Sequence, residues 1–114
     1  MSMAELEHQR HAEERGNLLR LLKENYTIGM TTVNSLAGAM DMLGQSMSFE
    51  SLRFQLQYLE DQGYAKLYRN RDMAGWREDR RNLGRGDEVR FAKLLPKGLM
   101  LLDGRCPEDP MVRF

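Results

Sequence analysis

Apolar residues recur at intervals of three and four in the segment SFESLRFQLQYLEDQGY, residues 48–64. That spacing predicts an α-helix with one apolar face, which we expect to contact the core. Ser48 can accept a backbone N–H bond at the start of the helix, and Gly63 permits the left-handed residue that ends it. Both ends of the helix are therefore signalled in the sequence. The residues expected on its core face are Phe49, Leu52, Leu56 and Leu59.

Two helices are predicted before this one. The first runs from residue 4 to about residue 25 and becomes apolar only in its second half. The second starts at Thr31 or Thr32 and runs to about Leu43, where Gly44 follows. A short segment, residues 44–47, then leads into the helix described above. Two amphipathic helices joined by a tight glycine-containing turn are typical of a helix-turn-helix unit.

Two strands and a short helix are predicted after residue 64. Residues 64–69 are rich in aromatic side chains and partly alternate, residues 88–95 alternate imperfectly, and a long polar segment separates them. Pro96 then opens a short helix that Gly104 ends. This order predicts a mainly α fold with a small antiparallel β-hairpin, in the α+β class.

We expect one domain and two flanking segments in the 114 residues. The domain spans residues 16–103. Residues 1–15 are expected to form a polar helical extension that is solvated, frayed or in contact with a second subunit. Residues 104–114 contain two prolines and are expected to run as an extended tail over the surface.

Charge is distributed unevenly along a chain whose formal net charge is zero. The segment 66–97 holds ten basic and five acidic residues, and the rest of the chain therefore carries a net charge of −5. This asymmetry is typical of a basic binding surface on an acidic body, although a solvated loop shows it as well.

Several classes of function are disfavoured by what the sequence lacks. No apolar run is long enough to cross a bilayer and no apolar signal segment lies near the start, which favours a cytoplasmic protein without a membrane partner. The lone Cys106 can form no internal disulfide. His8 and His11 have no third metal ligand nearby, so we expect them to be solvated and expect no metal. No catalytic constellation is found, so neither an enzyme, a cofactor nor a small-molecule ligand is expected.

Two motifs resemble a known family. The pattern L-x-x-L-x-x-x-G-[LY], here Leu56, Leu59, Gly63 and Tyr64, resembles the recognition-helix segment of bacterial winged-helix DNA-binding proteins. The ending LPKGLMLLDG followed by P-x-x-P-x-V resembles the closing segment of small winged-helix proteins of Mu-like prophages. The resemblance covers residues 18–102 and implies a winged helix-turn-helix fold in a small regulator of transcription that binds double-stranded DNA. Because one winged helix covers one half-site, it also implies a homodimer, for which residues 1–15 are the expected contact.

The resemblance also implies which residues contact DNA. Those on the helix, facing the major groove or its flanking phosphates, are Ser48, Glu50, Ser51, Arg53, Phe54, Gln55, Gln57 and Tyr58. The loop between the strands, residues 70–87, would be the wing. Its contact residues, with the last residue of the strand before it, are Arg69, Arg71, Trp76, Arg77, Arg80, Arg81 and Arg85.

The helix itself departs from a basic recognition helix. It carries a net charge of −2, and Phe54 and Tyr58 lie opposite its apolar face. Either the wing supplies most of the electrostatic attraction and the helix a modest base readout, or the helix face binds a protein instead. A third possibility is that both aromatic rings pack beneath the wing or the first helix. The alternative function is therefore a winged-helix interaction module without nucleic-acid binding.

Overall fold

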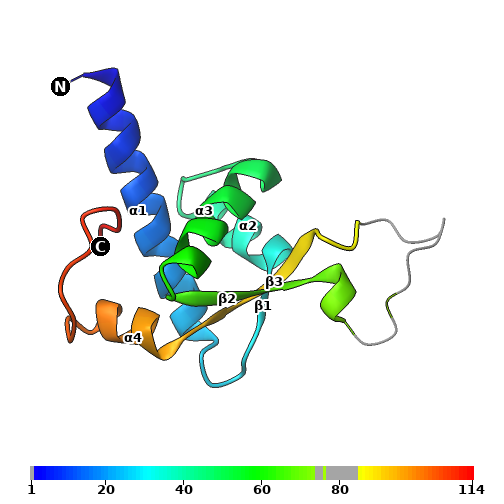
Figure 1. The fold of residues 1–114 in the computed structure, drawn as a ribbon. Helices are drawn as coiled ribbons and strands as arrows, with labels where there is room; N and C mark the ends of the chain where they lie inside the picture. Colours follow the sequence, from blue (N-terminus) through cyan, green and yellow to red (C-terminus); the bar gives the residue numbers. More distant parts are fainter. Residues whose placement is uncertain (1, 74–75, 77–84) are drawn as a thin grey trace.

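The computed structural model describes residues 2–73, 76 and 85–114. In this part of the chain the fold is mixed α+β, with four α-helices and one three-stranded antiparallel sheet (Figure 1). The coarse fold class expected from the sequence is therefore confirmed. The elements are α1 (Met3–Glu24), β1 (Thr31–Thr32), α2 (Val33–Met42), α3 (Phe49–Asp61), β2 (Ala65–Arg69), the 3₁₀ turn η1 (Asn70–Asp72), β3 (Val89–Leu94) and α4 (Pro96–Leu102).

Helix α1 is one continuous helix that crosses the domain boundary predicted between residues 15 and 16. It begins at a capping box in which the Ser2 hydroxyl accepts a bond from the Glu5 backbone N–H at 3.2 Å. Its first turns extend beyond the body of the molecule (Figure 1) and residues 2–8 are exposed. Ala12, Glu14 and Arg15, in contrast, are buried. The expectation of a solvated or frayed segment is therefore wrong for these three residues, because the C-terminal tail and α3 pack on this part of α1.

The ends of α2 and α3 follow the capping signals in the sequence. Thr32 and Ser48 are the N-caps, and their hydroxyls accept bonds from backbone N–H groups at 3.0 and 3.1 Å. Gly44 and Gly63 follow the two helices with φ values of 79° and 80°, a backbone conformation that residues other than glycine rarely adopt. These predicted boundaries are confirmed.

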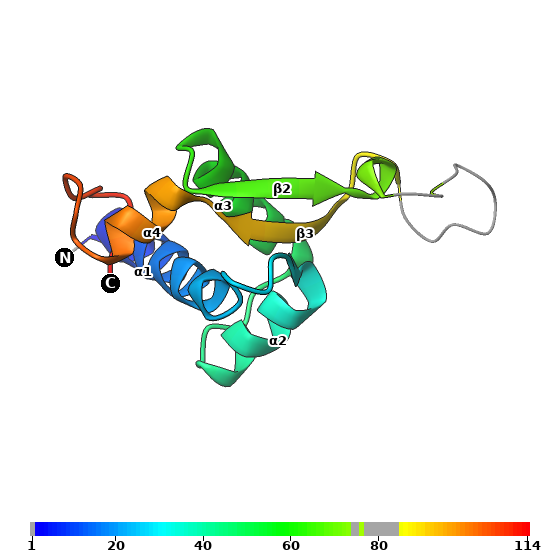
Figure 2. The same ribbon diagram turned by 90° about the horizontal axis from the view of Figure 1, so that it is seen from below.

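The sheet has the strand order β1-β3-β2, and both pairings are antiparallel. The two strands predicted at residues 64–69 and 88–95 pair with each other as β2 and β3, with Tyr68 opposite Phe91. Strand β1 was not predicted, because two threonines are too short to show an alternating pattern. Figure 2 shows β2 and β3 side by side past α3, with β2 running toward η1 and β3 running back toward α4.

The core lies between the first three helices and the sheet. Phe49 does not belong to it, contrary to expectation, and is 46% exposed because it is the first residue of α3 and lies at the margin of the packed region. The tail after α4 lacks regular structure, as expected, but its Val112 is buried in the core. The largest apolar side chains that are less than 2% exposed are Leu18, Leu19, Leu22, Leu36, Met40, Leu52, Leu56, Leu59 and Leu94.

Candidate functional site

The candidate site is a groove between the outer face of α3 and the adjoining ends of β2 and β3. Its volume is about 500 Å³ and it is open to solvent. Residues from the helix and from the hairpin line it together. We call it the α3–hairpin groove. It is lined by Glu50, Arg53, Phe54, Gln57, Arg69, Arg85, Asp87, Glu88 and Val89.

The first turn of α3 presents small polar groups to solvent. Ser48, Glu50 and Ser51 are all exposed. The Ser48 hydroxyl accepts from the Ser51 backbone N–H at 3.1 Å and donates to the Ser51 hydroxyl at 3.0 Å. These three predicted site residues therefore lie together on an accessible surface.

Phe54 is the most exposed large apolar side chain of α3. It is 70% exposed, and Phe49, five residues earlier, is 46% exposed. The Arg53 guanidinium lies 5.5 Å from the centroid of the Phe49 ring, within the range of a cation–π contact. Phe54 therefore does not pack beneath the wing or the first helix, so this possibility is wrong for Phe54.

Both arginines that face the groove from α3 and β2 are paired within the chain. Arg53 Nη2 lies 2.6 Å from Glu88 Oε1, at the start of β3. Arg69 Nη2 lies 3.6 Å from Glu60 Oε1 and donates to Gln57 Oε1 at 3.2 Å. These pairs join α3 to the hairpin and reduce the positive charge available to a ligand.

Gln55 is not at the groove, contrary to expectation. It is 1% exposed and lies on the core face of α3. Arg15 Nε donates to its side-chain oxygen at 2.6 Å, and its side-chain nitrogen lies 2.8 Å from His11 Nδ1. A buried amide needs one hydrogen-bond partner for its oxygen and another for its nitrogen. Both partners, Arg15 and His11, come from α1.

Tyr58 also lies away from the groove, because its hydroxyl donates to the carboxylate of Asp109 in the tail at 3.2 Å. The Arg15 guanidinium lies 4.1 Å from the centroid of the Tyr58 ring. The Tyr64 hydroxyl donates to the same carboxylate at 2.8 Å. Burial raises the pKa of both tyrosines, and the neighbouring Asp109 charge and hydrogen bonds raise the pKa of each further. Tyr58 therefore packs against α1, as one of the expected alternatives had it.

Arg15 is a structural link between α1, α3 and the tail that the sequence did not predict. It is buried, its Nη1 donates to the Met111 carbonyl at 3.0 Å, and burial lowers the pKa of its guanidinium. In the sequence, Arg15 lies in the half of the first predicted helix that has few apolar residues, and an arginine there is ordinarily solvated. Its neighbour His11 was expected to be solvated, but its Nδ1 lies 3.0 Å from Glu14 Oε1 and it is half-buried, so this expectation is wrong.

The start of the predicted wing is held by backbone contacts around Asn70. This residue is buried, its side-chain nitrogen donates to the Arg85 carbonyl at 2.9 Å, and its backbone N–H donates to the Glu88 carbonyl at 3.0 Å. Arg71 and Arg85 are exposed on either side of it, and Arg85 lies 3.5 Å from Asp87. Trp76 is half-buried, with its ring against Gly86. The other predicted wing residues, Arg77, Arg80 and Arg81, lie outside the described residues.

Other kinds of site find no support in the part of the chain that the structure describes. There, no group of three His, Cys, Asp or Glu side chains is arranged to hold a metal ion. None of the described helices is both long enough and apolar enough to cross a membrane. Cys106 is a free, half-buried thiol.

Comparisons with protein-family models, with curated proteins and with solved structures find no match to this chain. Functional inference therefore depends on the chemistry of the α3–hairpin groove. Its exposed groups are the carboxylates of Glu50 and Asp87, the aromatic ring of Phe54 and the guanidinium of Arg85. This set can accept hydrogen bonds, contact methyl groups and attract an anion, whereas it offers no nucleophile beside a general base.

Proposed function

We propose that this chain is a DNA-binding protein of the winged-helix type, a small regulator of transcription of bacterial or prophage origin. The observation that carries the proposal is the accessible outer face of α3, the second helix of a helix-turn-helix pair, directly beside an antiparallel hairpin. In this arrangement α3 enters the major groove while the hairpin follows the phosphate backbone.

Base contacts fall to fewer residues than the sequence predicted. Gln55 and Tyr58 are held inside the chain. Arg53 and Gln57 line the groove but are bonded to Glu88 and Arg69. Glu50, Ser51 and Phe54 are therefore the side chains of α3 left to read base edges. A carboxylate can accept from the cytosine amino group, a serine hydroxyl can donate or accept, and an aromatic ring can contact the thymine methyl group. With so few direct contacts, we propose modest sequence specificity.

Phosphate contacts fall to the exposed arginines of the hairpin. Arg71 and Arg85 flank its start and are exposed, and the contact of Arg85 with Asp87 at 3.5 Å is itself open to solvent. The pairs that Arg53 and Arg69 make with acidic residues are less exposed. Replacing both Arg71 and Arg85 by alanine is expected to weaken binding to a random-sequence duplex pool. Each lost phosphate contact reduces the slope of log K against log salt by about 0.9, so the slope should fall by about two units. Fluorescence anisotropy between about 50 and 200 mM salt measures it.

The matched control replaces Arg20 and Arg105, which are exposed on α1 and after α4. This pair removes the same charge from a part of the molecule that does not line the groove. It is expected to leave the salt slope unchanged. If the two double variants lower the salt slope equally, the attraction between protein and duplex is due to overall charge, and the hairpin does not contact phosphate.

We also propose that the regulator is a homodimer, because one winged helix contacts one half-site. The first turns of α1 extend away from the body (Figure 1) and carry Met3 and Leu6, which are 73% and 47% exposed. An apolar pair three residues apart along one helical surface, with no cover in the described residues, is a suitable contact for a second copy.

A second candidate function is a protein-binding module that uses the same groove. The observation in its favour is the exposure of Phe49 and Phe54 together with the internal pairing of Arg53 and Arg69, which leaves an aromatic and nearly neutral surface. Replacing both phenylalanines by alanine is then expected to abolish self-association in sedimentation velocity while the circular dichroism spectrum is unchanged. Under the DNA proposal the same variant remains self-associated and loses duplex affinity instead.

A further inference from the structure

The C-terminal tail, residues 104–114, is attached to α1 by its backbone. The Arg113 backbone N–H donates to the Ala12 carbonyl at 2.9 Å, in the middle of α1. One turn further along the helix lies Gly16, where a Cβ atom would lie closer than 3.0 Å to the carbonyl of Arg113. Glycine is a poor helix former, so its presence inside α1 is explained by this close approach. The absence of a side chain at residue 16 is what lets the tail reach the helix.

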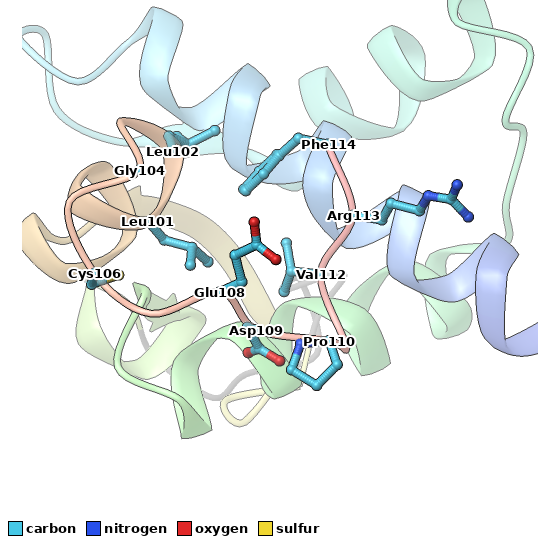
Figure 3. Close-up of a pocket in the computed structure, with 10 residues that line it drawn as sticks. All are labelled: Leu101, Leu102, Gly104, Cys106, Glu108, Asp109, Pro110, Val112, Arg113 and Phe114. Carbon is cyan, nitrogen blue, oxygen red and sulfur yellow. The ribbon is translucent and has the colours of Figure 1, made fainter.

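The same tail is attached to α3 through Asp109. Its carboxylate accepts from the Tyr58 hydroxyl on α3 and from the Tyr64 hydroxyl at the junction between α3 and β2. The Met111 backbone N–H donates to this carboxylate at 2.8 Å, which fixes its position in the tail. Figure 3 shows Asp109 between Glu108 and Pro110, on the stretch of tail that passes over the end of α3.

Arg15 adds a third connection, between the attachment of the tail to α1 and its attachment to α3. It donates to Met111 in the tail and to Gln55 on α3, and it stacks on the Tyr58 ring. Tail, α1 and α3 are therefore joined by one continuous set of polar contacts, which on α3 uses residues that do not line the groove. Displacement of the tail removes partners from Tyr58 and Arg15 at the same time.

We propose that Asp109 is a positioning residue for α3, and that the tail carrying it docks on α1 at Gly16. The contacts of the tail hold α3 at Tyr58, outside the groove, so they set the angle at which Glu50 and Phe54 face the groove. The effect on DNA affinity rests on the function proposed above, whereas the docking of the tail does not.

The chain contains matched glycines for the test of docking. Gly16 and Gly38 both lie inside helices, but a Cβ at Gly38 meets no atom within 4 Å. Gly38→Ala is expected to raise the midpoint of thermal unfolding, because alanine is the better helix former. Gly16→Ala is expected to lower it, by roughly 5 °C, because the new methyl group displaces the tail. The two variants should therefore shift the midpoint in opposite directions.

Cys106, which is the only cysteine of the chain and lies in the tail, reports docking directly. In the Gly16→Ala variant we expect a thiol reagent such as DTNB to modify Cys106 roughly tenfold faster than in the unaltered chain, because a detached tail exposes it. Gly38→Ala should leave the rate unchanged. If Gly16→Ala raises the midpoint as Gly38→Ala does and leaves the thiol rate unchanged, the docking proposal is overturned.

The positioning role is tested with Asp109→Asn, which keeps the shape of the side chain and removes its charge. Well below the unfolding midpoint, amide hydrogen exchange is expected to be roughly tenfold faster in α3 and unchanged in α2. Duplex affinity is expected to fall about tenfold with the salt slope unchanged, because no phosphate contact is lost. A role in stability alone would lower the unfolding midpoint and leave both the exchange of α3 and the affinity of the folded protein unchanged, which would overturn the proposal. If exchange in α3 rises but the unaltered chain binds no duplex, the positioning role stands and the proposed function fails.

Discussion

Replacing Gln55 by alanine is expected to lower the free energy of unfolding by about 2–4 kcal/mol. The substitution leaves the buried Arg15 Nε without the acceptor that lies 2.6 Å away and opens a cavity on the core face of α3. Hydrogen bonds to charged groups contribute about 1.5–3 kcal/mol each, and a buried donor left without a partner costs its desolvation. Urea denaturation followed by circular dichroism measures the change.

Gln57→Ala is the matched control on the same helix. Gln57 is half-buried at the groove and bonds to Arg69, Glu60 and Asp61. Contacts between exposed or half-exposed polar groups contribute at most about 1 kcal/mol, so this variant should be nearly as stable as the unaltered chain. Equal stability losses for the two glutamines would contradict the burial of Gln55. If Gln55→Ala instead kept full stability and lost duplex affinity, the residue would be a base reader as the sequence suggested.

Features that depend on neighbouring residues in the chain were predictable from the sequence. Ser48 as N-cap and Gly63 after α3 are local signals, and the helical spacing of Leu52 and Leu56 identified the core face. The prediction that Phe49 lies in the core is wrong, because helical periodicity gives the direction of a side chain but not where the packed region ends. The predicted order of helices and strands depends on such local signals and was therefore largely correct.

The errors at the site come from partners that are distant in sequence. Gln55 is bonded to Arg15, 40 residues away, and Tyr58 to Asp109, 51 residues away. On a helical wheel both residues lie on a polar flank, and without their partners a polar flank is expected to face solvent. The tail is the least predictable element, since its docking depends on the missing side chain of Gly16, which in sequence resembles a weak position in a helix.

Replacing Gly98 by alanine is expected to lower the free energy of unfolding by about 1–3 kcal/mol. Gly98 lies inside α4, and a Cβ there would lie closer than 3.0 Å to the carbonyl oxygen of Tyr64 and to the Leu94 side chain. The Tyr64 carbonyl also accepts from the Leu95 backbone N–H at 2.9 Å, so it cannot move without breaking the bond that joins the start of α4 to the end of α3. The clash therefore outweighs the gain in helix propensity, which is about 0.5–1 kcal/mol.

The comparison with Gly38→Ala removes the contribution of helix propensity, because both glycines are inside helices and only Gly98 is enclosed. Thermal unfolding should show the Gly98→Ala midpoint lower by several degrees and the Gly38→Ala midpoint higher than that of the unaltered chain. Because Tyr64 also donates to Asp109, displacement of α4 should reach the tail, and the thiol of Cys106 should react faster in Gly98→Ala. If Gly98→Ala is as stable as Gly38→Ala, α4 does not pack closely against the junction between α3 and β2.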